Sequence, residues 1–138
     1  MLLRPREFSI DDPDAPKIME DLLEALGAEV VDFPYKTKCC GAYHAVHLKE
    51  VAAGLSQRIL EQAVEAGADM VVTACPLCDF NLGERQTEIK KHFPDFESIP
   101  VVYYTQLMAL AFGQNEEATA FDVNDPDPRP VLAEKGLV

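Results

Sequence analysis

The sequence has no tryptophan and no apolar run near the ~18 residues that a membrane-spanning helix needs. Basic residues are also scarce: 12 Lys and Arg stand against 24 Asp and Glu, which gives a net charge of −12. This charge repels nucleic-acid phosphates and anionic lipid, and so argues against nucleic-acid binding and membrane insertion. The opening segment, Met1 to Pro5, is too short for a secretory signal. We therefore expect a cytoplasmic protein.

The chain length and the absence of any internal repeat predict one domain covering residues 1–138. A chain of this size buries about two-thirds of its unfolded surface, so it needs neither a disulfide nor a metal merely to fold. The hydrophobic content of 48% and charged content of 26% are ordinary for a globular protein.

Apolar residues at helical spacing predict four helices, and short apolar runs predict three strands that alternate with them. The helices are expected at residues 18–26, 47–66, 76–91 and 106–112, and the strands at residues 28–33, 69–74 and 101–104. This alternation predicts an α/β fold, a single three-layer domain with a mainly parallel sheet flanked by helices. The proline-rich segment at 125–130 predicts that residues 113–138 form an extended tail.

Four cysteines form two tight pairs, Cys39 with Cys40 and Cys75 with Cys78. In a cytoplasmic protein the thiols are normally kept reduced, so paired cysteines indicate metal or redox chemistry in preference to disulfides. Each pair follows a predicted strand. If these strands are parallel, both pairs lie at the carboxyl ends of the strands, the edge of the sheet where open α/β folds bind ligands.

The spacing within each pair indicates which kind of metal or redox site the cysteines could form. Cys75 precedes Pro76 at an expected helix start, where free N–H groups and the helix dipole stabilise a thiolate. Neighbouring side chains of an extended backbone diverge, so two vicinal thiolates suit several metal atoms better than one small ion. Gly41 permits a positive φ beside them. The pattern favours an iron–sulfur cluster over zinc, and a strained Cys39–Cys40 disulfide is expected only as an oxidation artefact.

Three other interpretations stay open at this point. Four thiolates also complete a closed tetrahedral Zn²⁺ site, which would make the chain a structural assembly module without redox activity. Cys75 and Cys78 alone could work as a redox dithiol, although this leaves Cys39 and Cys40 unexplained. The plainest interpretation is four buried free thiols that pack as small apolar residues.

Several residues near the vicinal pair are candidates for secondary roles. His44 and His47 could give a proton to a leaving thiolate or a hydrogen bond to a cluster sulfur, or could simply be surface residues. The basic residues Arg4, Lys36 and Lys38 could attract an anionic thiol cofactor in this acidic chain, or could be ordinary solvated side chains.

The combination of cysteine motifs resembles the cysteine-rich CCG domain found in the B subunit of heterodisulfide reductase, the C-terminal domain of that protein in particular. The resemblance is carried by Leu2-Leu3-Arg4-Pro5, Leu26-Gly27-Ala28, Cys39-Cys40-Gly41, Gly67-Ala68-Asp69, Val72-Thr73-Ala74-Cys75-Pro76-Leu77-Cys78, Asn81-Leu82 and Tyr104-Thr105-Gln106-Leu107. It extends over nearly the whole chain.

The resemblance implies one component of an oxidoreductase that acts on a disulfide. It implies a noncubane [4Fe–4S] centre held by Cys39, Cys40, Cys75 and Cys78, which helps to cleave the mixed disulfide of two thiol cofactors. Electrons would arrive through two heterodisulfide reductase partners, one carrying iron–sulfur clusters and one carrying a flavin, so turnover would need these partner subunits. Family proteins carry two CCG domains in tandem and an earlier cysteine that would fall before Leu2, so only these four cysteines carry over.

Overall fold

The computed structural model describes residues 10–12 and 14–138. Arg4 and the segment Leu2-Leu3-Arg4-Pro5 lie outside the described residues. The chain divides into two compact units, residues 1–30 and residues 31–138, and each is described by itself.

The first unit contains helix α1, Ile18–Ala25. The Asp11 carboxylate accepts hydrogen bonds from the backbone N–H groups of Lys17 and Ile18 at 2.7 and 2.8 Å, and so satisfies donors that a helix start leaves without partners. These bonds, the one from Ile18 foremost, lower the pKa of Asp11. Gly27 follows the helix at φ +92°, the left-handed conformation that commonly ends a helix.

The second unit is built on two parallel strands, β1 (Val71–Thr73) and β2 (Val101–Tyr103), in register with Val71 opposite Val101. Its helices are η2 (Ala42–His44), α2 (Lys49–Glu65), α3 (Pro76–Leu82), α4 (Gln86–His92), α5 (Tyr104–Ala111), α6 (Glu116–Thr119), η3 (Phe121–Val123) and α7 (Arg129–Glu134). The prediction of an α/β fold with parallel strands is confirmed. Within the described residues, no helix has the length and hydrophobicity needed to cross a membrane.

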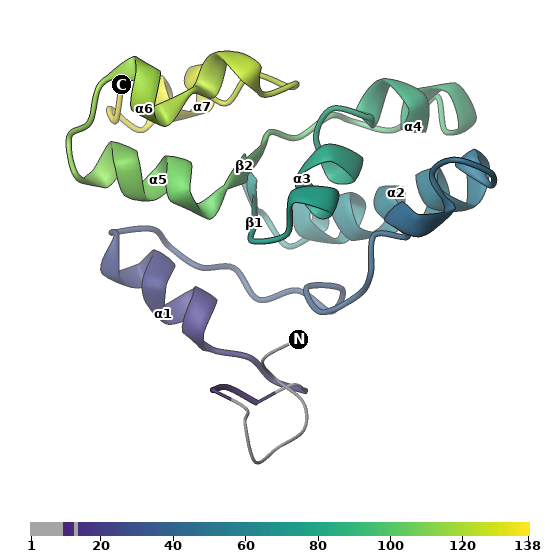
Figure 1. Ribbon diagram of the computed structural model, residues 1–138, viewed down its shortest axis with the longest axis horizontal. Coiled ribbons are helices and arrows are strands. Elements are labelled where there is room, and N and C mark those ends of the chain that lie inside the picture. Colours follow the sequence, from purple (N-terminus) through teal and green to yellow (C-terminus); the bar gives the residue numbers. More distant parts are fainter. Residues whose placement is uncertain (1–9, 13) are drawn as a thin grey trace. The chain divides into compact units, whose positions relative to one another are not determined.

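Alternation along the strands gives each face of this small sheet its own hydrophobic cluster. Val71 and Val101 pack with buried residues of α2 and α4, including Leu60 and Ile89. Val102 packs with Phe121 and Leu132, from η3 and α7. In Figure 1, α2, α3 and α4 lie on one side of the strands and α5, α6 and α7 on the other.

Two predicted elements differ from the structure. Residues 28–33 form no strand, and Val30 and Val31 are only half-buried there, whereas a strand of a parallel sheet needs burial on both faces. The helix predicted at 76–91 is interrupted after Leu82, so that α3 and α4 are separate helices. At the break, a Cβ added to Gly83 would lie 2.7 Å from the Asp79 carbonyl oxygen, so the close backbone approach depends on glycine.

The predicted extended tail is also wrong, because residues 113–138 fold onto the strands. They form α6, η3 and α7, and they bury Phe121 and Leu132. Pro128 is the N-cap residue of α7 and Pro130 lies in its first turn. A proline in the first turn costs no hydrogen bond, so the proline-rich sequence starts a helix here instead of preventing one.

Gln86 joins the helices to the segment that enters β2. Its buried side chain donates to the carbonyl groups of Leu82 and Ile99 at 2.8 and 2.7 Å and accepts from the Ile99 N–H at 3.1 Å. Buried polar groups that lose their partners are costly.

We predict that Gln86→Ala lowers the free energy of unfolding by about 1–3 kcal/mol, because it leaves the Ile99 N–H and both carbonyl groups without this partner. Urea unfolding followed by circular dichroism measures the change. Gln114→Ala, at an exposed glutamine, is the matched control and should change stability by less than about 0.5 kcal/mol. Equal effects of the two variants would contradict the assigned role of Gln86.

Candidate functional site

The second cysteine pair is placed by the junction of β1 and α3. Cys75 lies two residues after the end of β1 and is the N-cap residue of α3, with extended backbone at φ −119° and ψ 121°. Pro76 occupies the first helical position and Cys78 the third, as the sequence predicts. Cys75 is exposed, whereas Cys78 is partly buried.

The vicinal pair lies in a turn that ends at Gly41. The two cysteines differ sharply in burial, because Cys39 is exposed and Cys40 is only 1% exposed. Gly41 adopts φ +74° at the start of η2, and its N–H lies 3.4 Å from the Cys39 Sγ, which accepts a hydrogen bond from it. A Cβ on Gly41 would lie 2.5 Å from the Leu55 Cδ1. The turn therefore favours glycine for its backbone conformation, and a larger residue would also displace the end of the Leu55 side chain.

Buried polar side chains from α2 and α3 hold the backbone of Cys40. The Asn81 amide donates to the Cys40 carbonyl oxygen at 2.8 Å and to the Ser56 Oγ at 2.8 Å. Ser56 in turn donates to the same carbonyl at 3.3 Å. Arg85 donates to the Asn81 Oδ1 at 3.2 Å and so fixes the orientation of the amide. This network ties the turn to the two helices.

The Sγ atoms of Cys40 and Cys78 lie 3.2 Å apart, although the residues are 38 positions apart in sequence. The Cys78 thiol donates a hydrogen bond to Cys40, which lowers the pKa of Cys40 from 9.0 to about 6, with smaller help from the Ala42 N–H and Asn81. The same contact raises the pKa of Cys78, as do burial and the neighbouring Cys75. Cys40 is therefore the thiolate of the pair and Cys78 the proton donor.

The donor set consists of soft sulfur ligands, the type preferred by iron–sulfur clusters and by zinc. Cys78 contacts Cys40 and also neighbours Cys75, and Cys39 is next to Cys40 in sequence. Within the described residues, however, no three His, Cys, Asp or Glu side chains are grouped as the ligands of one metal ion. Sulfur donors from two segments suit both a polynuclear iron–sulfur cluster and a tetrahedral zinc site.

The remaining described candidates lie close to the vicinal pair in sequence. His44 is half-buried with its ring 4.1 Å from that of Tyr43, centre to centre, and His47 is exposed. Lys36 forms an ion pair with Asp32 at 2.7 Å, and Lys38 is exposed. Within the described residues, neither histidine forms a hydrogen bond to a cysteine sulfur.

Sequence reasoning missed the residues that position Cys40. Ser56 lies among the apolar positions of the predicted 47–66 helix, and the structure shows that it is buried. A polar residue on an apolar helix face needs a hydrogen-bond partner, so its position in the sequence could have indicated a structural role. Asn81 was noted only within the resemblance to the CCG family. Neither spacing nor composition indicates that both side chains reach the same carbonyl group.

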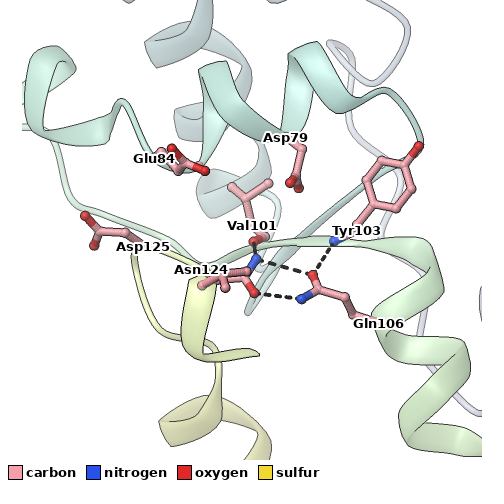
Figure 2. A pocket seen from close by; sticks show the side chains of 9 residues that line it. Asp79, Glu84, Val101, Tyr103, Gln106, Asn124 and Asp125 are labelled. Carbon is pink, nitrogen blue, oxygen red and sulfur yellow. Dashed lines mark hydrogen bonds between the residues drawn. The ribbon is translucent and has the colours of Figure 1, made fainter. Parts of the chain in front are cut away.

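A pocket of about 210 Å³ lies on another part of α3, between that helix, β2 and η3 (Figure 2). The amide of Gln106 exchanges hydrogen bonds with that of Asn124, and its oxygen accepts from the Tyr103 N–H at 2.9 Å. Asp79, next to Cys78, also lines it. Burial raises the pKa of Asp79, although its Oδ1 accepts a hydrogen bond from Thr73. The pocket thus adjoins the cysteine site through α3.

Thiols from two distant segments, gathered at the start of a helix that follows a parallel strand, define a cysteine-rich α/β domain. The family model described as CCG, cysteine-rich domain, matches residues 2–83. The chain therefore belongs to the CCG cysteine-rich domain family, and the resemblance seen in the sequence is confirmed.

Three curated relatives extend the comparison. The B subunit of the ferredoxin/F(420)H(2)-dependent CoB-CoM heterodisulfide reductase of Methanosarcina acetivorans is 34% identical over 128 residues, covering 89% of this chain and 42% of the relative. The 8-methylmenaquinol:fumarate reductase membrane anchor subunit of Wolinella succinogenes is 36% identical, over 80% of the chain and 39% of the relative. A protein of Archaeoglobus profundus, named as similar to the B subunit of heterodisulfide reductase, is 34% identical, over 80% of the chain and 38% of the relative. The chain thus spans about two fifths of the length of these relatives.

We predict that Gly41→Ala destabilises the protein by about 1–3 kcal/mol more than Gly113→Ala. Gly113 has a similar φ of +67° but open space around its Cα, so it controls for the backbone cost and leaves the overlap with Leu55 as the difference. Urea unfolding measures both, and adding Leu55→Ala to Gly41→Ala should recover part of the loss. Equal costs at the two glycines would show that Leu55 does not restrict the turn.

We also predict that one thiolate of the reduced, metal-free chain titrates near pH 6, measured by the ultraviolet absorbance of thiolates, because the pKa of Cys40 is lowered to about 6. Cys40→Ser should abolish this step, and Cys39→Ser is the matched control that keeps it. Since the folded pKa of Cys40 lies below its unfolded value, its stabilisation is lost as the pH falls from 9 through about 6, whereas the raised pKa of Cys78 lowers the stability again above pH 9. A first thiolate appearing only above pH 8 would contradict the assignment.

Proposed function

We propose that this chain is an iron–sulfur component of the heterodisulfide reductase type, which takes part in electron transfer to the disulfide of thiol cofactors. The observation that carries the proposal is the contact between Cys40 and Cys78, 3.2 Å apart across 38 positions of sequence. The family match and the names of the relatives from Methanosarcina and Archaeoglobus agree with it.

In this proposal Cys39, Cys40, Cys75 and Cys78 hold a noncubane [4Fe–4S] cluster. Such a cluster supplies one-electron steps when it is bound. The polypeptide contributes the thiolates, a Cys39 sulfur that accepts a hydrogen bond from the Gly41 N–H, and a Cys40 backbone anchored by Asn81. Hydrogen bonds to ligand sulfur tune the potential of such centres, so this turn is part of the redox site.

The surroundings of the cysteines support a need for partner chains. Large apolar side chains are exposed on the segments that carry the thiols, including Tyr43, Val46, Leu77 and Phe80 at 75%, 73%, 62% and 48%. Large apolar side chains exposed on the segments that carry the thiols are typical of an interaction site. We propose that a second CCG domain covers it, and that iron–sulfur and flavin subunits of the heterodisulfide reductase type supply the electrons. The chain alone should therefore turn over a small-molecule disulfide poorly.

Anaerobic reconstitution with iron and sulfide tests the proposal. We predict several iron atoms with acid-labile sulfide per chain, and iron content near background when Cys40, Cys75 or Cys78 is replaced by serine, since losing a ligand costs more than the roughly 10–100-fold affinity loss of an outer-shell change. Val46→Ser, in the same loop, is the control that removes no thiol and should bind as the wild type does.

Two outcomes would overturn the iron–sulfur proposal. One zinc per chain without sulfide would make the domain a structural module. A protein that stays colourless and metal-free, with Cys75 and Cys78 cycling reversibly to a disulfide, would make it a dithiol oxidoreductase. Measuring iron, zinc and sulfide in one sample separates the three cases.

A further inference from the structure

Three of the four thiols differ in their exposure to solvent and form a series from the surface to the core. Cys75 is exposed at the start of α3, Cys78 is partly buried one turn further on, and Cys40 is 1% exposed. The contacts follow the same order, because the Cys75 thiol neighbours that of Cys78, and the Cys78 sulfur contacts that of Cys40. A reagent from solution thus reaches Cys75 before it reaches Cys78 and Cys40, which we call the inner pair.

The sulfur atoms of the inner pair are close enough to form a disulfide bond. The two Sγ atoms at 3.2 Å need to approach by only about 1 Å to reach a disulfide bond length. The backbone of Cys40 is held by Asn81 and Ser56, and Cys78 is held within a hydrogen-bonded helix. The vicinal alternative, Cys39 with Cys40, requires a strained geometry and joins an exposed thiol to a buried one.

We propose that the metal-free chain carries out thiol–disulfide exchange with small disulfides, with Cys75 as the entry thiol and a Cys40–Cys78 disulfide as the product. Cys75 attacks one sulfur of the small disulfide, whose S–S bond breaks and releases one thiol. Cys78 passes its hydrogen-bonded proton to the Cys40 sulfur, attacks the Cys75 sulfur and releases the second small thiol, which leaves with that proton from Cys40. Cys40 finally attacks the Cys78 sulfur, which restores Cys75 as a thiol.

The exchange balances without another reactant. Two protein thiols lose two electrons and two protons, and the small disulfide gains them to become two thiols. The product disulfide joins the two more buried thiols of the series. External thiols can therefore reach only its Cys78 sulfur. One consequence rests on the proposed function: the product removes two of the four cluster ligands, so the oxidised chain must be reduced before it can take up iron.

Hydroxyethyl disulfide is the probe, because it is uncharged and is not repelled by a chain of net charge −12. Reduced, metal-free protein is treated anaerobically, its remaining thiols are alkylated, and the disulfide is located by peptide mass mapping. We expect the loss of two hydrogen masses and a link between Cys40 and Cys78, with Cys39 and Cys75 alkylated. A Cys39–Cys40 link, a lasting Cys75–Cys78 link, or mixed disulfides alone would overturn the inference.

Variants test the order of the steps. Cys78→Ser should leave the small thiol bound to Cys75 as a mixed disulfide, which is detected as an added mass. This readout depends on the exposed Cys75 and not on a change in the core. Cys75→Ser should slow formation of the internal disulfide by roughly tenfold or more, because it removes the accessible thiol. Gln114→Ala, at an exposed residue without a role in the cysteine site, is the control and should react like the wild type. Equal rates for the Cys75 and Gln114 variants would rule out the entry role of Cys75.

A final experiment distinguishes a failure of this inference from a failure of the proposed function. The oxidised and the reduced chain are each incubated with iron and sulfide in the absence of a thiol reductant. We expect uptake by the reduced chain only. If the link joins Cys40 to Cys78 and the reduced chain binds no iron, the exchange stands and the iron–sulfur proposal fails. If the reduced chain binds iron and the link lies elsewhere, the exchange inference fails and the iron–sulfur proposal stands.

Discussion

The hydrogen bonds that Asn81 and Ser56 make to the carbonyl group of Cys40 are the constraint on which the cysteine site depends. They join the Cys39–Gly41 turn to α3 and α2, segments that are far apart in the sequence. A buried carbonyl and a buried amide each need a partner, and here each is the partner of the other. If either group were removed, the other would stay buried without a partner, which costs its full desolvation free energy. The turn is therefore held in place, and Cys40 stays within reach of Cys78.

The rest of the second unit supplies the frame for that arrangement. The parallel pairing of β1 and β2 fixes where β1 ends, and the N-cap of α3 follows two residues later at Cys75. Packing of Val71 and Val101 against α2 and α4 sets the position of the helix that carries Ser56. A thiol site built in this way combines one local motif with one long-range contact, and its chemistry depends on both.

The sequence predicted the elements with strong local signals and failed where burial decided the outcome. Apolar spacing located α1, α2 and α5 within a few residues, and Pro76 marked the start of α3. The strand expected at 28–33 rested on two valines, but strand formation in a parallel sheet depends on neighbours that a local window does not contain. The proline-rich C-terminal segment was interpreted as extended, although Phe121 and Leu132 become buried and the prolines fit a turn and a helix start.

The sequence by itself determined the chemistry of the site: four thiols, the glycine after the vicinal pair and the proline after Cys75 are local features that specify donor type, turn and helix start. It also determined the family, since these motifs and their spacing identify a CCG domain. Only the tertiary structure decided which sulfurs meet, which thiol is buried, and which side chains hold the turn. Those properties arise from contacts across some 40 positions of sequence, and such contacts depend on how the helices and strands pack, which periodicity along the chain does not encode.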